Sequence, residues 1–213
     1  MAATHRYTTP EGYGETEIRI QKSRFITYVN RVDSEEEASS FVRGIAKTHW
    51  DATHNCYAYV VGRLSEVQRS SDDGEPSGTA GRPILEAIRS RGLTDTAVVV
   101  TRYFGGIKLG AGGLIRAYNR AATEGLDAAG QVDWYLHRSL EITADYPAMG
   151  KLEHELIATG YEMEPPRFTD QVRWKIWVPN GEEQPLIDLV AEQTSGRGSV
   201  EYGEVDYRPR TVK

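Results

Sequence analysis

The sequence predicts a two-domain α+β protein, and three observations lead to this fold class. Short strand and helix patterns alternate along the chain, and their order restarts near residue 136. The 213 residues are 39% apolar, which is enough to fill two small cores. The balance of charge also shifts at this point, since residues 136–213 are clearly acidic while residues 1–135 are nearly neutral. We therefore predict domains at 1–135 and 136–213.

The first domain is predicted to have the element order ββαββαβα. Apolar alternation indicates strands at 16–20 and 23–31. Ser34 and Glu37 have the spacing of a capping box and open a helix. Strands at 57–61 and 67–70 follow, then a helix at 81–89 with Pro83 in its first turn, and a buried strand at 97–101.

The last helix of this domain is predicted to begin near Ala111, after a turn rich in glycine. One set of residues recurs at helical spacing and is expected to face the core: Leu114, Ile115, Tyr118, Ala122 and Leu126. The polar residues fall on the other face: Arg116, Asn119, Arg120 and Thr123.

The second domain is predicted to have the order βαββαβ. Strands are expected at 140–144, 161–167, 171–178 and 199–207, and helices at 147–159 and 181–193. This order is that of a ferredoxin-like domain.

The glycine-rich region between Gly78 and Gly113 is the most informative part of the chain. A strand, a glycine turn and a helix start together build an anion site, because the first N–H groups of a helix lack partners and the macrodipole favours negative charge. Lys108 precedes this helix and adds to that field. Neither the P-loop nor the dinucleotide-binding spacing is present, so an ATPase or a dehydrogenase is not expected. The alternative is that these glycines only permit tight turns and close packing.

We predict that this region binds the phosphates of a nucleic acid. The predicted binding residues are Arg102, Tyr103, Phe104, Gly105, Gly106, Lys108, Gly110, Gly112, Gly113 and Arg116. Tyr103 or Phe104 would stack on a base, or alternatively would only hold the turn against the core. The loop predicted to support this surface contains Asp72, Asp73, Glu75, Gly78, Thr79, Gly81 and Arg82.

The three carboxylates of that loop, on Asp72, Asp73 and Glu75, also allow a metal site or an acid/base pair. We favour a turn that caps the following helix and holds the basic segment, with Thr79 as a candidate N-cap. No metal and no cofactor is expected.

His54 and Cys56 are two residues apart, so on a strand they would share a face and could form a base and a nucleophile. A buried cysteine is more often a small apolar residue, and no third orienting group is evident. His49 with Trp50, and the pair Trp174 and Trp177, are expected to be packing residues. No catalytic residue is assigned.

Composition favours a cytoplasmic protein with no membrane segment. Residues 1–11 are polar, no apolar run approaches the length of a membrane span, and Cys56 is the single cysteine. The formal net charge is −6, yet residues 82–120 hold seven basic and two acidic side chains. A local basic surface on an acidic protein is compatible with phosphate contact, because salt limits the relevant field to about 10 Å.

Two long segments resemble the signature of the YigZ/IMPACT family: DGEPSGTAGRPIL at 73–85 and VVVTRYFGGIKLGAGGLIRAY at 98–118. The flanking segments 22–26 and 53–59 are similar to the family's upstream segments. The resemblance implies a first domain like domain 2 of ribosomal protein S5 and domain IV of elongation factor G. It also implies a ferredoxin-like second domain similar to domain V of that factor. Eukaryotic members of the family regulate translation through a ribosome-associated activator of a stress kinase.

These observations together predict a non-enzymatic, translation-linked protein that binds RNA or the ribosome through the basic glycine-rich surface. The second domain would contact RNA or protein through its exposed sheet. One alternative is a module that binds a partner protein in the regulation of translation. Another is a small hydrolase that uses the loop from Asp72 to Thr79.

Overall fold

The computed structural model describes residues 6–210, so the first five residues of the polar segment 1–11 lie outside the described part. The chain divides into two compact units, one reaching Trp134 and the other running from Tyr135 to Pro209. Both units combine helices with antiparallel strands, and the protein is a two-domain α+β protein. In residues 6–210 no helix combines the length and the apolar character that crossing a bilayer requires.

The first unit contains one five-stranded antiparallel sheet in the order β2-β3-β6-β4-β5. Its strands are β2 (Gly14–Ile20), β3 (Ser23–Arg31), β6 (Thr96–Tyr103), β4 (His54–Val61) and β5 (Val67–Ser71). Each begins or ends within three residues of its predicted bounds. A further strand, β1 (Arg6–Pro10), was not predicted, because its residues RYTTP lack an apolar alternation; it pairs with β7 (Gln131–Ala144).

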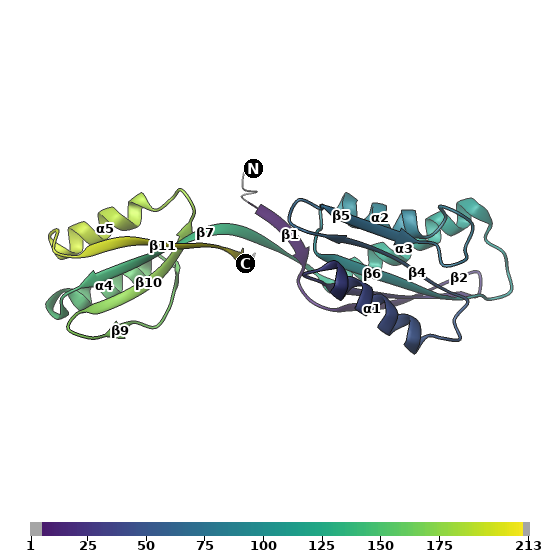
Figure 1. Ribbon diagram of the computed structural model, residues 1–213, viewed down its shortest axis with the longest axis horizontal. Coiled ribbons are helices and arrows are strands. Elements are labelled where there is room, and N and C mark those ends of the chain that lie inside the picture. Colours follow the sequence, from purple (N-terminus) through teal and green to yellow (C-terminus); the bar gives the residue numbers. More distant parts are fainter. Residues whose placement is uncertain (1–5, 211–213) are drawn as a thin grey trace. The chain divides into compact units, whose positions relative to one another are not determined.

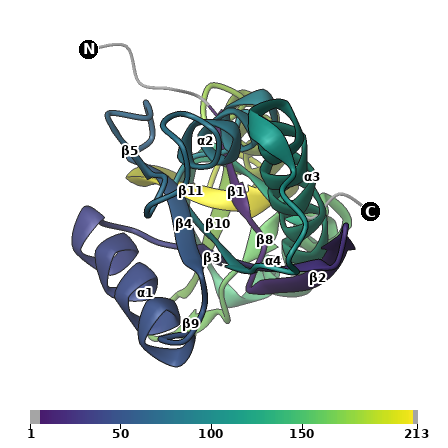
Figure 2. The ribbon, with the colours of Figure 1, turned by 90° about the vertical axis from the view of Figure 1, so that its right-hand side faces the viewer.

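Three helices cover the two faces of this sheet, as Figures 1 and 2 show within the first unit. Helix α1 (Glu35–Thr48) lies on one face, and its N-cap Ser34 accepts the Glu37 N–H as the capping box predicts. Helices α2 (Gly81–Ser90) and α3 (Gly110–Ala129) lie side by side on the other face.

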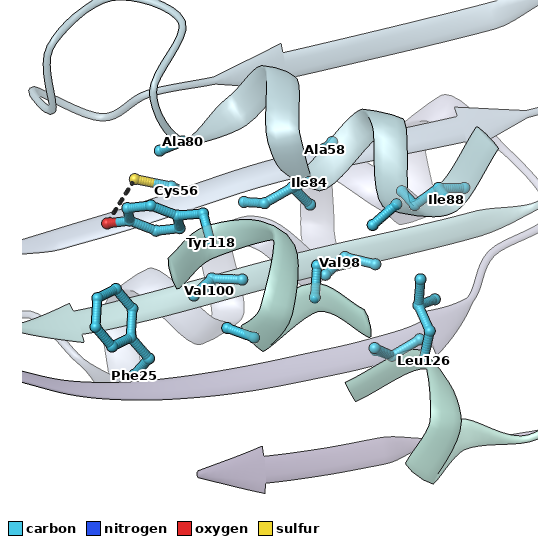
Figure 3. Close-up of a cluster of buried hydrophobic side chains, with 14 of the residues drawn as sticks. Phe25, Cys56, Ala58, Ala80, Ile84, Ile88, Val98, Val100, Tyr118 and Leu126 are labelled. Atoms are coloured by element: carbon cyan, nitrogen blue, oxygen red, sulfur yellow. Dashed lines mark hydrogen bonds between the residues drawn. The ribbon is translucent and has the colours of Figure 1, made fainter. Parts of the chain in front are cut away.

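The main core of the first unit fills the space between the sheet and the pair α2 and α3 (Figure 3). Ile84 and Ile88 of α2 meet Val98 and Val100 of β6 there, with Tyr118 of α3 fully buried. One predicted core residue, Ile115, is instead 43% exposed. The reason is that α3 turns its small residues to the sheet, so closely that a Cβ on Gly125 would lie 2.4 Å from Thr27.

The second unit has the predicted order βαββαβ, with its second strand broken into two short pieces. Its elements are the end of β7, α4 (Tyr146–Ala158), β8 (Glu162–Met163), β9 (Arg167–Phe168), β10 (Val172–Pro179), α5 (Gln184–Thr194) and β11 (Ser199–Arg210). In its sheet β11 lies next to β7, β7 next to β10, and β10 next to β8 and β9. Trp174 and Trp177 are both buried, as expected.

Candidate functional site

A cavity of about 410 Å³ opens in the first unit where β4 and β6 approach the first turn of α3. The glycine-rich turn and the acidic loop both contribute to it. Its walls are formed by Thr53, His54, Glu75, Pro76, Arg102, Phe104, Lys108, Leu109, Gly110, Ala111 and Leu114. The sequence analysis identified the two segments that meet here, but not the wall formed by Thr53.

The first turn of α3 borders this cavity through Gly110 and Ala111. The N-cap residue is Leu109, and no side chain forms a capping hydrogen bond at this end of the helix. The first N–H groups of a helix have no intrahelical partner and carry the positive end of its dipole. Lys108 is exposed beside them, so this edge of the cavity favours an anion.

Gly105 has a packing role in the turn that leads to α3. A Cβ there would lie 2.0 Å from the backbone carbon of Lys22, so only glycine lets the turn approach the β2–β3 hairpin. Gly106 and Gly110 have positive φ angles, as tight turns require. Part of the glycine content therefore follows from the fold alone, as the alternative interpretation held.

Gly112 is different, because the fold does not explain it. It is an exposed helical residue, and a Cβ there would meet only the Arg116 guanidinium, at 3.6 Å. Glycine inside a helix costs about 0.5–1 kcal/mol relative to alanine. The bare backbone at this position leaves room for a ligand to approach the first turn of α3 closely.

Asp72 caps α2, as the analysis of the acidic loop predicted. Its carboxylate accepts the backbone N–H groups of Gly78, Ala80 and Gly81 at 2.8, 2.9 and 2.8 Å. Burial alone would raise the pKa of Asp72, but these three hydrogen bonds outweigh it and hold the pKa below the ordinary 3.8. The N-cap prediction for Thr79 is wrong: Ala80 is the N-cap, and the Thr79 hydroxyl donates to the Pro76 carbonyl.

Arg102 has a role other than the predicted one. The residue is 4% exposed, and its Nη1 donates to Glu75 Oε1 at 2.5 Å while its Nη2 donates to Ser23 Oγ at 3.2 Å. The Tyr118 hydroxyl donates to the same Glu75 oxygen at 2.8 Å. Arg102 therefore neutralises the buried Glu75 carboxylate in the wall of the cavity and does not stand free for a phosphate.

The two adjacent aromatic residues lie in different surroundings. The Tyr103 hydroxyl contacts His49 Nδ1 at 2.9 Å and donates to Asp51, and its ring packs in the core on the α1 face of the sheet. Phe104 is 45% exposed and lines the cavity. Of the two predicted stacking residues, Phe104 is the one at the cavity.

The remaining basic residues of the prediction also differ from one another. Arg82 pairs with Glu86 one turn further along its helix, as Arg120, which was not a predicted site residue, does with Glu124. Lys108 and Arg116 are exposed, and neither has an ion-pair partner among the described residues.

The proposed pair of His54 and Cys56 is not a base and a nucleophile. Cys56 is fully buried and its thiol donates to the Asp72 carbonyl at 3.0 Å; burial raises the pKa of this thiol (Figure 3). His54 lines the cavity, with Nδ1 2.7 Å from the Asp73 carbonyl oxygen. In the described part of the chain, no three acidic, histidine or cysteine side chains are grouped to hold a metal.

Trp50 was expected to pack, but it is 83% exposed. It follows α1 directly, in the loop that leads to Thr53, whose hydroxyl oxygen accepts the Phe104 N–H at 3.0 Å. No periodic signal in the sequence separates such an exposed tryptophan from a packed one.

Comparison with known proteins identifies the family. The Impact N-terminal domain matches residues 21–126, and a domain of unknown function, DUF1949, matches residues 142–197. The chain is 46% identical to the IMPACT family member YvyE of Bacillus subtilis, over 98% of this chain and 96% of that protein. The chain belongs to the IMPACT family. The described cavity lies wholly within the part that matches the Impact N-terminal domain.

Two further relatives extend this result. An IMPACT family member of Thermus thermophilus is 41% identical, over 85% of this chain and 99% of that protein. A crystal structure titled only as an hypothetical protein superimposes with a TM-score of 0.61 at 28% identity, covering 95% of this chain and 99% of that one. The similarity therefore extends over both domains of this IMPACT family member, along nearly the whole chain.

Proposed function

We propose that this IMPACT family member is a translation-linked protein that binds RNA through the first unit, with RNA phosphates at the first turn of α3. The observation that carries the proposal is the uncapped helix start beside two exposed cations, Lys108 and Arg116, which form no ion pair in the part of the chain that the structure describes. The link to translation comes from the family, whose eukaryotic members regulate translation.

The chemistry of this surface supports contact with the RNA backbone. Free N–H groups and the helix dipole favour a phosphate, and Lys108 and Arg116 add positive charge that no carboxylate within residues 6–210 pairs with. Gly112 leaves the backbone accessible at the same turn. A surface of this kind positions a strand without reading its sequence, because phosphate contacts carry no base information.

The test is a salt titration of RNA affinity with a fluorescein-labelled 12-residue oligouridylate. Each phosphate contact contributes a log–log slope of about −0.7 for a single strand. Lys108→Ala and Arg116→Ala should each lower the affinity and flatten the slope by that amount. Lys47→Ala is the matched control, since Lys47 is an exposed lysine at the end of α1, on the other face of the sheet. Unchanged affinity and slope in both test variants contradict the proposal.

A second candidate function, binding a partner protein of translational control, is favoured by exposed apolar residues on the same surface. Phe104, Ile107 and Ile115 are 45, 41 and 43% exposed. Such side chains commonly anchor protein interfaces. Binding that survives high salt and is lost in Ile107→Ala would favour this candidate over RNA.

The hydrolase alternative receives no support from the acidic loop. Asp72 caps α2, Asp73 accepts the Asn55 N–H at 2.5 Å, and Glu75 is paired with Arg102. All three carboxylates hold the fold together.

A further inference from the structure

The cavity beside α3 has two kinds of wall. Phe104, Leu109, Leu114 and Pro76 provide apolar surface. Thr53, His54 and Lys108, with the first turn of α3, provide polar or positive surface, and Glu75 and Arg102, which neutralise each other, also line the cavity. The volume of about 410 Å³ lies in the range of small-ligand sites, which span about 300–1,000 Å³. A ligand that fits both walls must carry a flat apolar part and an anionic group.

The polar wall offers one hydrogen-bond acceptor and one donor. His54 Nδ1 must carry a proton, because its partner at 2.7 Å is the carbonyl oxygen of Asp73, which can only accept. In the neutral ring Nε2 is then an acceptor, and its nearest charged neighbour, Glu75 Oε2, is 3.8 Å away, beyond hydrogen-bond distance.

Thr53 supplies the complementary group. Its oxygen accepts the Phe104 N–H at 3.0 Å, which leaves the hydroxyl hydrogen free to donate. A neighbouring donor and acceptor match the edge of a nucleobase, which presents N–H and carbonyl or ring-nitrogen groups side by side. The exposed Phe104 ring offers the face on which such a base can stack.

We propose that this cavity holds a single nucleotide, with the phosphate at the first turn of α3 beside Lys108 and the base against Phe104 and the wall of Thr53 and His54. The shared chemistry is a phosphate ester joined to a planar base. It can come from an unstacked residue of an RNA strand, in which case the inference rests on the proposed function, or from a free nucleoside monophosphate.

The test compares ligands that differ only in the base. One arm uses labelled 12-residue oligouridylate against an abasic ribose-phosphate oligomer of equal length. The other arm uses uridine 5′-monophosphate against ribose 5-phosphate. A stacked base should strengthen binding roughly 5- to 150-fold in at least one arm.

Substitutions test which residues produce the gain in affinity from the base. Phe104→Ala should abolish the gain from the base while leaving the affinity for the abasic ligand unchanged, and His54→Phe should reduce it. Ile157→Ala is the matched control: it truncates an exposed apolar residue of α4 in the second unit that does not line the cavity, so the gain should persist. Circular dichroism verifies folding, which should survive because Phe104 is a surface residue.

The outcomes separate the two proposals. If base and abasic ligands bind equally in both arms, or if the gain survives Phe104→Ala, the nucleotide site is overturned. Salt-dependent binding of both oligomers would then still support the proposed RNA function. If only the monophosphate arm shows a gain that depends on Phe104, and neither oligomer binds, the nucleotide site stands and the RNA function fails.

Discussion

The start of α3 in the first unit and the strands β10 and β11 of the second unit both carry basic side chains. Lys108 and Arg116 at the start of α3 differ from Lys175 and Arg208 on these strands in how they are paired. On the second unit, Lys175 pairs with Glu204 at 2.5 Å and Glu164 at 3.2 Å, and Arg208 pairs with Glu162 at 2.9 Å. On the first unit, Lys108 and Arg116 have no such partners among the described residues.

This difference shows that the local number of basic residues is a poor guide to phosphate binding. A cation that already neutralises a carboxylate gives up that pairing when it meets a phosphate, whereas an unpaired cation does not. Arg102 makes the same point inside the first unit, since its charge is balanced by Glu75. We therefore expect stronger RNA contacts at Lys108 and Arg116 than at Lys175 and Arg208.

The largest expected effect tests the buried pair against an exposed one. Glu75→Gln leaves the Arg102 charge buried without a counterion and should lower the free energy of unfolding by about 3–5 kcal/mol. Glu204→Gln breaks an exposed pair, and the loss should stay below about 1 kcal/mol. Denaturant unfolding followed by circular dichroism measures both. Equal losses would show that burial does not distinguish the two pairs.

The next effect concerns charge at the start of α3. Ala111→Glu places a carboxylate where the phosphate is proposed, and two like charges about 4 Å apart repel by about 4 kcal/mol near a protein surface. RNA affinity should fall by at least about tenfold. The stability of the helix should be kept, because a negative charge in the first turn interacts favourably with the helix dipole. Ala111→Gln is the neutral control and should retain binding. If Ala111→Glu retains its RNA affinity, the RNA phosphates do not bind at the first turn of α3.

A smaller effect concerns the cap of α2 and its dependence on pH. The folded pKa of Asp72 is below its ordinary 3.8, so the stabilisation is present above that value and is lost as pH falls through the folded pKa. Asp72→Ala should lower the free energy of unfolding by about 0.5–2 kcal/mol at pH 7. The difference from the wild type should shrink in acid below pH 3.8.

Asp206→Ala on β11 serves as the comparison from the second unit, since its carboxylate accepts the backbone N–H of the adjacent Tyr207. Asp206→Ala should lower the free energy of unfolding by less than Asp72→Ala does. A difference between Asp72→Ala and wild type that is independent of pH would mean that the Asp72 charge plays no part in the cap.

The smallest effect separates binding from stability at Gly112. Gly112→Ala should stabilise α3 by about 0.5–1 kcal/mol and still weaken RNA binding, because the added methyl group occupies the approach to the first turn. Gly44→Ala in α1 meets nothing within 4 Å, so it should stabilise without changing affinity. Thermal unfolding and RNA titration of both variants measure this. Unchanged RNA affinity in Gly112→Ala would show that RNA does not approach the backbone closely at the first turn of α3.

The sequence predicted most elements because their apolar periods are clear, and the glycine turn because its residue types are unusual. It did not separate Arg102 from Lys108, since only the folded chain brings Glu75 to Arg102. One signal was available: Arg102 lies two and four residues after Val100 and Val98, which face the core, so alternation along the strand places it on the buried side. The same alternation places Tyr103 on the opposite face with Val99.

The other differences between the predicted and the observed structure have local causes. Strand β7 was expected at 140–144 but begins at Gln131; Val132, Trp134 and Leu136 at its start alternate with polar residues, so this signal was available in the sequence. Helix α5 begins at Gln184 and not at 181, with a proline in its first turn. The wall formed by Thr53 and His54 depends on where β4 begins against β6, which is a matter of register that sequence patterns do not give.

Amide hydrogen exchange of the full chain, with and without the 12-residue oligouridylate, tests the central claim most directly. The first N–H groups of α3 have no helical partner and should exchange rapidly in the free protein. RNA binding should slow exchange at residues 110–113 and leave the sheet of the second unit unchanged. Protection at β10 and β11, with none at the start of α3, would contradict the claim that the unpaired cations of the first unit form the RNA-binding surface.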